Sequence, residues 1–407
     1  MSLISIAISW RELIARIVEA EREGYCEVSW EHLEPAETAV QEYSAEDGGS
    51  SLRELRTYKL VAIKAWAARF SRGTPQQGVE RGFVGLVLPQ DFKTASRLRV
   101  YRQVLEADVA AQAAPSDGIA LFDGSPPIRW GRVGLRRWQE ALEFVGGVLR
   151  SNWDLVGGLS EATCASEEPE CVAEVLERSR VRPFSAYLLL RLASKGSLDN
   201  VINMARESGL GNSWLDAMEN LERLIVLRNA LESIWARGST PVFVVKTSRA
   251  TSFCGSTLPD VHLIEMRLHA LRDLDMGFTA RLYTSVTQYF GLAAGSAERL
   301  YPAVRGVRDF YQRGIAVLSA FTRLRRAGYV FKVEAILRRD QVDGVNEVNL
   351  ARSMLSKVAS LPLTAEGYPM ALVIADRNAR VSEAEMDSVL KALGADLLPE
   401  SRSVLRV

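Results

Sequence analysis

The segment GIALFD, residues 118–123, constrains the fold more than any other stretch of the chain. Its apolar residues follow one another without the polar alternation of a strand that has one face in water. Such a strand is buried on both faces, which predicts an α/β protein whose sheet is covered by helices on both sides. A second apolar strand is predicted at 240–248, TPVFVVKTS.

Upstream of this strand, the sequence predicts a meander and a helix. AEDGG at 45–49 and the strand-like segments 56–70 and 81–89 indicate three consecutive antiparallel strands. Residues 94–114 then place apolar side chains at helical spacing. The order of three strands, a helix, a strand and a further helix is the opening order of a ribonuclease H-like domain.

Downstream, helical patterns dominate residues 131–240, which we interpret as a large helical insertion between strands of the sheet. The remaining predictions are a strand at 328–339, a helix at 346–361, a buried strand at 368–376 and a last helix that begins with the capping box of Ser382 and Glu385. We therefore expect a ribonuclease H-like mixed sheet flanked by helices, with an N-terminal helical segment over 1–40, one main domain over 41–395 and a tail over 396–407.

Composition excludes several classes of protein. The 407 residues, 47% of them hydrophobic, are enough to bury a large core. No apolar stretch reaches the roughly 18 residues of a membrane span, and the start of the chain becomes amphipathic too early for a signal peptide. We expect a cytoplasmic protein with no membrane contact, and an amphipathic helix over residues 9–24 that packs on the core or on a partner.

The four cysteines, Cys26, Cys164, Cys171 and Cys254, form no CxxC pair and have no zinc-like spacing to a histidine. They are interpreted as reduced thiols, so neither a disulfide framework nor a structural zinc site is predicted.

Charge gives a weaker indication of the partner. The 50 basic and 50 acidic residues cancel, so no global positive field favours nucleic acid. Subtracting the 8 lysines from the 50 basic residues leaves 42 arginines. This excess suits bidentate phosphate contacts, but it also arises from genome base composition.

Four carboxylates are the candidate site. Asp47 and Asp123 each precede a glycine at the end of a predicted strand, and Asp376 ends the last predicted strand. Glu106 lies on the helix that leads into the Asp123 strand. A cluster of these four side chains would repel itself unless cations were bound.

Oxygen ligands without histidine or cysteine favour Mg²⁺ or Mn²⁺ over zinc. Two such ions about 4 Å apart activate a water molecule and stabilise the leaving oxygen in phosphodiester hydrolysis. The pattern thus indicates a nuclease. The alternative is that Asp-Gly pairs are common turn formers and that acids at strand ends are simply solvated.

Three other residues are candidates for substrate contacts. Lys246 at the end of VFVVK can reach a phosphate, and Arg249 can hold the DNA backbone, or both are solvated surface residues. Tyr368 either contacts a phosphate or base, or anchors the chain beside Pro369.

Four segments resemble, in order, the motif blocks of the NurA nucleases. They are AEDGGSSLRELRTYKLVAIKAWA, RVYRQVLEADVAAQAAPSDGIALFDGSPP, VFVVKTSRA and GYPMALVIADRNARVSEAEMD. The resemblance spans roughly residues 40–390, with a poorly matched middle. The second block is its most specific part, since the acid on the helix, the spacer and the DGS strand end all agree.

The resemblance implies a ribonuclease H-like, Mn²⁺-dependent enzyme of archaea and bacteria, with single-strand endonuclease and 5′ to 3′ exonuclease activity. It implies a homodimer that processes single-stranded DNA and duplex DNA ends, in end resection and double-strand break repair, with the hexameric HerA translocase. By position, the family's catalytic acids match Asp47, Glu106, Asp123 and Asp376, and its functional tyrosine matches Tyr368. The rival predictions are a non-catalytic scaffold that docks a translocase and an unrelated metal phosphatase.

Overall fold

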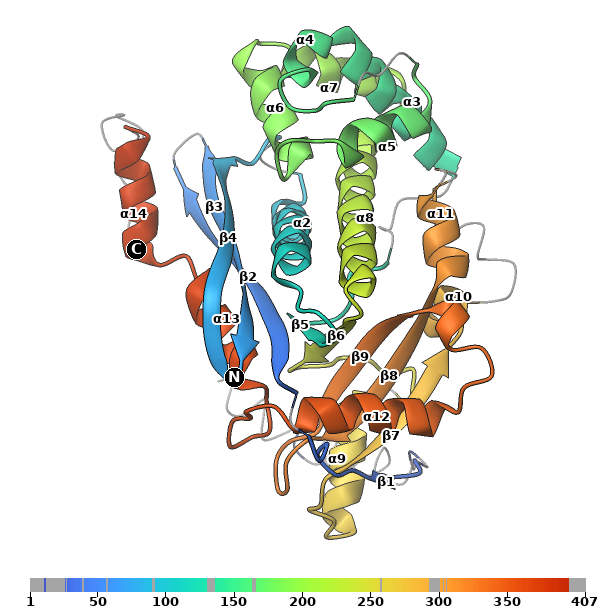
Figure 1. Ribbon diagram of the computed structural model, residues 1–407. Coiled ribbons are helices and arrows are strands. Elements are labelled where there is room, and N and C mark those ends of the chain that lie inside the picture. The colour runs from blue at the N-terminus through green and yellow to red at the C-terminus, as the bar shows by residue number, and fades with distance from the viewer. Residues whose placement is uncertain are drawn as a thin grey trace.

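A mixed sheet of nine strands organises the computed structural model (Figure 1). The structure describes residues 11, 26, 28–38, 40–55, 58–89, 92–129, 136–162, 166–256, 258–292, 301–302, 304 and 306–394. The strands are β1 (Glu31–His32), β2 (Glu42–Glu54), β3 (Lys59–Ser71), β4 (Thr74–Leu86), β5 (Ile119–Asp123), β6 (Thr240–Val245), β7 (Gly277–Tyr283), β8 (Ile315–Arg323) and β9 (Phe331–Arg338). Their order in the sheet is β1-β7-β8-β9-β6-β5-β2-β3-β4.

The strand directions divide the sheet into three parts. Strands β2, β3 and β4 form the antiparallel meander that the sequence predicts. In the centre, β5 pairs in parallel with both β2 and β6. Strands β9, β8, β7 and β1 continue from β6 with antiparallel pairing. The two strands with continuous apolar sequences, β5 and β6, therefore occupy the middle of the sheet, where both faces are buried.

Helices cover both faces of the sheet, as β5 predicts. The α-helices in the described part of the chain are α2 (Thr94–Ala113), α3 (Arg136–Ser151), α4 (Trp153–Val156), α5 (Pro169–Glu177), α6 (Phe184–Ser194), α7 (Leu198–Glu207), α8 (Ser213–Ala236), α9 (Asp260–Ala270), α10 (Val286–Tyr289), α11 (Val307–Asp309), α12 (Glu347–Ala359), α13 (Met370–Ala379) and α14 (Glu383–Ala392). Ala120 and Phe122 of β5 belong to the core formed with α2 and α8, whereas Ile119 and Leu121 belong to the core formed with α12 and α13.

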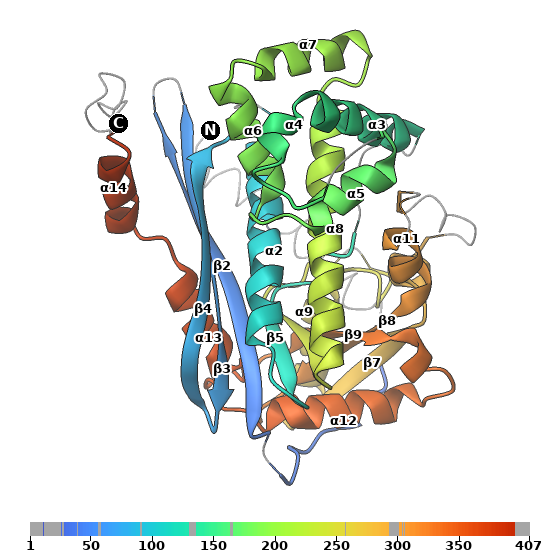
Figure 2. The same cartoon turned by 45° about the horizontal axis from the view of Figure 1, so that its top comes forward.

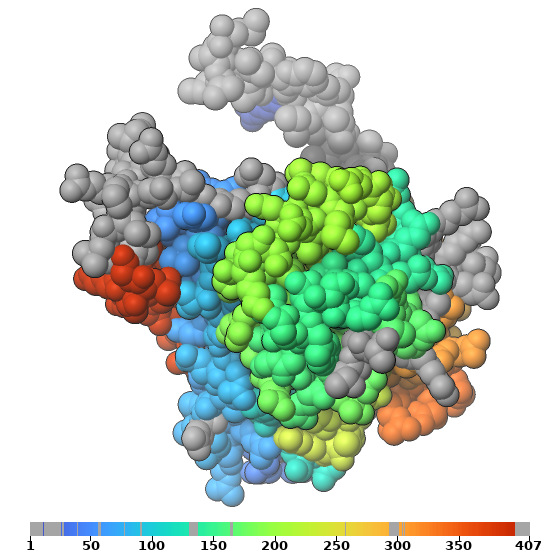
Figure 3. Space-filling model, turned by 90° about the horizontal axis from the view of Figure 1, so that it is seen from above, coloured from blue at the N-terminus to red at the C-terminus, as the bar shows by residue number. Residues whose placement is uncertain are grey.

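Helices α2 and α8 lie side by side over the sheet in both ribbon views (Figures 1 and 2). Helices α3 to α7 gather at the N-terminal end of α8, where α6 also contacts β4, and Figure 3 shows them covering much of that end of the molecule. Helices occupy most of residues 136–236, in agreement with the sequence pattern. That they form an insertion in a ribonuclease H-like core stays a prediction.

The buried strand predicted at 368–376 is wrong, because this segment forms helix α13. Its buried residues, Ala371, Leu372, Ala375 and Ala379, recur with helical rather than alternating spacing. A short apolar run does not distinguish strand from helix by itself. The preceding Pro369, whose missing N–H a helix start tolerates, was the available signal.

Other elements of the structure also differ from the sequence predictions. Strands β7 and β8 were not predicted, and the segment predicted as helical over 1–40 contains the short strand β1. The capping box of Ser382 and Glu385 at the start of α14 is confirmed. Apart from Arg11, the predicted helix at 9–24 lies outside the described residues, as does the tail at 396–407. None of the helices in the described part of the chain is long and apolar enough to span a membrane.

The prediction of reduced cysteines is wrong for the described residues. Cys26 and Cys254 form a disulfide across 228 residues of sequence, and Cys171 is also disulfide-bonded. Sequence spacing does not reveal such a pair, because the two cysteines are brought together only when the N-terminal segment packs beside the loop after β6.

Candidate active site

Asp47 and Asp123 lie where strand β2 separates from β5. The parallel pairing of these strands ends with Glu46 opposite Phe122, and each aspartate is the next residue. Asp123 is the last residue of β5, as predicted. Asp47 is not at a strand end, because β2 continues to Glu54 along its other neighbour, β3. The two carboxylates therefore sit at a fork in the sheet, which a rigid pair of strands holds in place.

Glu106 reaches this fork because helix α2 passes close to β2 at Gly48. A Cβ atom on Gly48 would lie 2.4 Å from Glu106 Oε1 and 2.6 Å from Arg102 Cγ. Glycine therefore permits the approach that a larger residue would block. Arg102, one turn before Glu106 on the same helix, places its Nε 3.0 Å from Glu106 Oε1.

Asp376 comes from helix α13 rather than from a strand end, which corrects the prediction for this residue. The helix approaches β2 at Gly49, where a Cβ atom would lie 2.3 Å from the carbonyl oxygen of Ala379. Asp376 accepts a hydrogen bond of 2.6 Å from Arg380, one turn later. The two glycines after Asp47 thus admit a helix on each face of the strand.

The electrostatic effects of these carboxylates on one another show that the four belong to one cluster. Burial, together with the negative charges of Asp123 and Asp376, raises the pKa of Asp47 to about 6. Burial also raises the pKa of Glu106 to about 7, against the opposing effect of Arg102 and together with the charges of Asp47 and Asp123. Asp47 therefore lies near both Asp123 and Asp376, and Glu106 lies near Asp47 and Asp123, which places the four carboxylates in one region of the structure.

A fifth carboxylate, Glu46, was missed by the sequence reasoning. It is 2% exposed, and its Oε2 has no hydrogen-bond partner among the described residues. Burial raises its pKa well above the usual value, and the charges of Glu106, Asp47 and Asp123 add to this effect. The available signal was an acid one residue before Asp47, in a strand that also contains the buried residues Tyr43 and Ala45.

A cavity of about 230 Å³, here called the carboxylate pocket, opens beside this cluster. Three acids line it, Glu46, Glu106 and Asp123, together with Arg102. The loop after β5 also lines it, including Gly124, whose φ of +99° favours glycine. Phe122, Phe243 and Leu227 supply the apolar part of the wall.

Lys246 is adjacent to the cluster, as its position at the end of β6 predicts. Its Nζ donates a hydrogen bond of 2.7 Å to Asp123 Oδ2, and its side chain is 43% exposed. The same Nζ lies 4.6 Å from the ring centre of Tyr368. Arg249 is exposed in the loop that follows β6.

Tyr368 is buried rather than available for stacking on a base. It is 5% exposed and its ring packs against Phe331. Burial raises the pKa of its hydroxyl above the usual value, and the adjacent Asp123 carboxylate adds to this effect. Its burial favours the predicted anchoring of the chain beside Pro369, at the start of α13, over direct contact with a phosphate or a base.

The side chains of the cluster fit a divalent cation chemically. They offer oxygen donors without histidine or cysteine, and the Oε2 atom of Glu46 has no partner among the described residues. Negative charge is in excess, because ion pairs in the described part of the chain join only three of the five acids to basic groups. Among the described residues, no group of three His, Cys, Asp or Glu side chains is already arranged to hold a metal ion. Asp123 and Glu106 are instead paired with Lys246 and Arg102.

Comparison with known proteins identifies the fold. The NurA domain family model matches residues 24–381. The structure is similar to the NurA nuclease from Sulfolobus solfataricus, with 15% identity, a TM-score of 0.58 and coverage of 97% of this chain and 96% of that one. A structure of NurA bound to dAMP and manganese has 14% identity, a TM-score of 0.55 and coverage of 98% and 95%. No curated protein sequence matches the chain.

Proposed function

Because the chain belongs to the NurA family, as the match over residues 24–381 shows, we propose that it is a metal-dependent nuclease that hydrolyses DNA phosphodiester bonds. The observation that carries the proposal is the convergence of Asp47, Glu106, Asp123 and Asp376 at the fork between β2 and β5. A similar structure contains manganese and dAMP, which supports a divalent cation and a nucleotide as the ligands.

In this proposal Asp47, Glu106, Asp123 and Asp376 hold Mn²⁺ or Mg²⁺, two ions per site, and Glu46 adds a fifth oxygen donor group. The cations supply positive charge at the reacting phosphate and lower the pKa of the attacking water. The excess of buried acids supports this assignment, because each acid must lose its proton to bind a cation and cation binding then offsets the charge repulsion.

The basic side chains have separate tasks in substrate binding. Lys246 is half exposed and holds Asp123 by a single ion pair, so its ammonium can also contact a phosphate of the bound strand. Arg249, exposed three residues later, contacts the DNA backbone further from the reacting bond. Tyr368 is a positioning residue, because its buried ring packs under Lys246 and beside Asp123.

Further features of the proposal follow from family membership. They are a ribonuclease H-like core, single-strand endonuclease and 5′ to 3′ exonuclease activity, a homodimer, a cytoplasmic location, and a role in DNA end resection and double-strand break repair with a HerA-type hexameric ATPase. The strand order supports the first of these, since the meander β2-β3-β4 adjoins the parallel strands β5 and β6 through β2. Single-stranded DNA and duplex ends are the proposed substrates.

The test is cleavage of end-labelled single-stranded DNA with and without Mn²⁺. Glu106→Gln is expected to abolish Mn²⁺-dependent cleavage. Asp108→Asn is its matched control, since Asp108 lies two residues later on α2 and pairs with Arg81 outside the cluster. Wild-type cleavage by a folded Glu106→Gln protein at saturating Mn²⁺ would contradict the proposed site.

The same assay separates the alternatives. A non-catalytic scaffold that docks a translocase would bind DNA without cutting it at any Mn²⁺ concentration, and the absence of a preformed metal-ligand group among the described residues is the observation in its favour. A metal phosphatase would hydrolyse small phosphate esters and leave the polymer intact.

A further inference from the structure

A second cavity of about 200 Å³, here called the aromatic pocket, lies between the loop after β6, helix α10 and strands β7, β8 and β9. Aromatic side chains line much of it, among them Phe253, Tyr283, Tyr289 and Phe290, and the charged side chains Asp260 and Lys332 also line it. Its volume is below the roughly 300–1,000 Å³ of pockets for drug-sized ligands, so it suits a single planar ring system.

The aromatic pocket adjoins the carboxylate pocket across one pair of strands. Phe243 lines the carboxylate pocket and is directly opposite Glu334 in the pairing of β6 with β9. Glu334 in turn contacts two residues that line the aromatic pocket, because its Oε1 lies 2.6 Å from the Tyr289 hydroxyl and 2.7 Å from Lys332 Nζ. Directly opposite residues of an antiparallel pair project from the same face of a sheet. Both pockets therefore belong to the face that α8 covers in part.

Two segments of chain run from one pocket to the other. The first begins at Lys246, which binds Asp123, and reaches Phe253 in the wall of the aromatic pocket. The second begins at Asp123 and ends at Arg129, whose guanidinium carbon lies 5.7 Å from the ring centre of Phe290. These two segments therefore connect the wall of the carboxylate pocket with that of the aromatic pocket.

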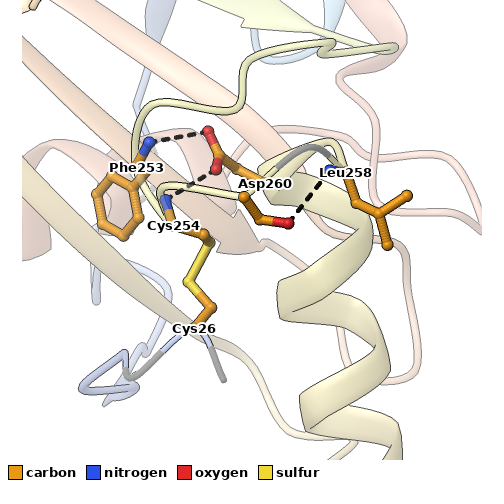
Figure 4. Close-up of a disulfide and its surroundings, with 6 residues drawn as sticks. Cys26, Phe253, Cys254, Leu258 and Asp260 are labelled. Carbon is orange, nitrogen blue, oxygen red and sulfur yellow. Dashed lines mark hydrogen bonds between the residues drawn. A yellow bond between two sulfur atoms is a disulfide. The ribbon is translucent and has the colours of Figure 1, made fainter. Parts of the chain in front are cut away.

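The wall formed by Phe253 is fixed in position (Figure 4). Asp260 is fully buried, and its two carboxylate oxygens accept hydrogen bonds from the backbone N–H groups of Phe253 and Cys254 at 3.1 and 2.8 Å. The disulfide between Cys254 and Cys26 ties the same turn to the N-terminal segment. A ring held in this way loses little conformational entropy when it stacks on a ligand.

The chemistry of the pocket matches one nucleobase. Aromatic faces stack on any base. Lys332 uses one of its three N–H donors on Glu334, so the others can donate hydrogen bonds to the edge of the base. The exposed Arg281 lies with its guanidinium carbon 4.6 Å from the ring centre of Phe253, where it can neutralise the phosphate attached to that nucleotide. We propose that the aromatic pocket binds one unstacked base of the same DNA strand whose phosphodiester lies in the carboxylate pocket.

This inference rests on the proposed nuclease function, and it predicts a fixed distance along the strand between the bound base and the cut bond. The experiment uses end-labelled single-stranded DNA with one abasic site, cut by the full-length protein with Mn²⁺. We expect one bond at a constant offset from the abasic site to be cut about tenfold more slowly, since stacking of a base on an aromatic ring contributes about 1–3 kcal/mol. Equal cutting at all bonds around the abasic site would overturn the proposal.

Phe253→Leu is the variant that tests the pocket. Leucine keeps apolar volume against Phe321 but removes the ring, so the offset-specific slowing should disappear. Phe144→Leu is the matched control, because Phe144 is half-buried in α3 and packs against Trp214 instead. Tyr283→Leu, on the other wall, gives a second variant if Phe253→Leu unfolds. Slowing that persists in a folded pocket variant would contradict the assignment.

A binding readout distinguishes failure of this inference from failure of the proposed function. Short single-stranded DNA containing 2-aminopurine is titrated with the Asp123→Asn protein in EDTA, so that no cleavage is needed. The Asp123→Asn protein should quench the fluorescence of 2-aminopurine. If a further Phe253→Leu substitution abolishes this quenching and a further Phe144→Leu substitution does not, the base site is supported even if the wild-type protein cuts no DNA. Identical quenching with and without the Phe253 ring overturns it even if Mn²⁺-dependent cleavage is found.

Discussion

The two halves of helix α2 both contain buried charge, but they balance it differently. In the first half, Arg97 and Glu219 of α8 are each 1% exposed, and Arg97 Nε donates a hydrogen bond of 2.8 Å to Glu219 Oε1. The Tyr101 hydroxyl also lies 2.8 Å from Arg97 and donates to the same oxygen of Glu219. In the second half, Glu106 has Arg102 as a partner but shares its surroundings with three more acids, Asp47, Asp123 and Glu46.

This difference separates a structural role from a functional one. The Arg97–Glu219 pair contains one positive and one negative charge, so the network needs nothing from outside the chain to offset burial. In the carboxylate cluster, burial and the charges of neighbouring acids together raise the pKa values of Asp47 and Glu106, which makes their charged forms costly. Only the second arrangement gains from a bound cation, so one helix both anchors the fold and presents the site.

The largest expected effect is the loss of cleavage in Asp123→Asn. The amide keeps the shape of the side chain but removes its charge, and we expect Mn²⁺-dependent cleavage to fall about 1,000-fold or more. The free energy of unfolding should stay within about 0.5 kcal/mol of wild type, because Asp123 is partly exposed at a strand end. Single-turnover cleavage and urea unfolding measure the two quantities. A large loss of stability with retained cleavage would show that Asp123 has a structural role rather than a functional one.

The opposite result is expected for Glu219→Ala. Removal of this acid leaves Arg97 buried without its partner, which should lower the free energy of unfolding by about 3 kcal/mol. Urea unfolding at pH 7.5 measures the loss. The double variant Arg97→Met, Glu219→Leu is the control, since it replaces both charges by apolar groups and should recover most of the stability. Equal stability of Glu219→Ala and wild type would show that the pair does not anchor the helix.

The sequence predicts the carboxylate site better than it predicts the elements that carry it. Asp123 and Glu106 were placed correctly because a continuous apolar strand and a helical repeat are local patterns. Asp376 lies near Asp47, but on a helix rather than at the predicted strand end, because a short apolar run is compatible with both helix and strand.

The features that the sequence did not predict depend on contacts between distant segments. Glu46 is significant because α2 buries it beside Glu106, and the Cys26–Cys254 disulfide joins residues 228 positions apart. The packing of α2 and α13 against the glycines after Asp47 likewise shows why Gly48 and Gly49 are needed. Local patterns contain no information on such close approaches.

A third test uses pH to probe the carboxylate cluster, which must lose protons before it binds a cation. Asp47 and Glu106 must lose their protons to bind a cation, and their pKa values in the metal-free protein are about 6 and about 7. At subsaturating Mn²⁺, cleavage should therefore rise by about 100-fold between pH 5.5 and pH 8 and then level off. Initial rates at fixed Mn²⁺ give the profile, and saturating Mn²⁺ should shift its midpoint to lower pH. A profile that is flat over this range would contradict the requirement for deprotonation.

The smallest expected effect is a gain in stability when Asp47 becomes Asn. Its pKa is raised from 3.8 to about 6 in the folded, metal-free protein, so the folded state binds a proton more tightly than the unfolded state does. The free energy of unfolding therefore falls as pH rises from about 4 to about 6 and is level above that range. Asparagine removes this cost and its oxygen can still accept the hydrogen bond from the Gly48 N–H.

In EDTA, Asp47→Asn should be about 1–2 kcal/mol more stable than wild type at pH 8, after allowance for partial solvent screening, and equal to it near pH 4. Urea unfolding at both pH values tests this, and a variant less stable than wild type at pH 8 would show that Asp47 stabilises the fold as Glu219 does.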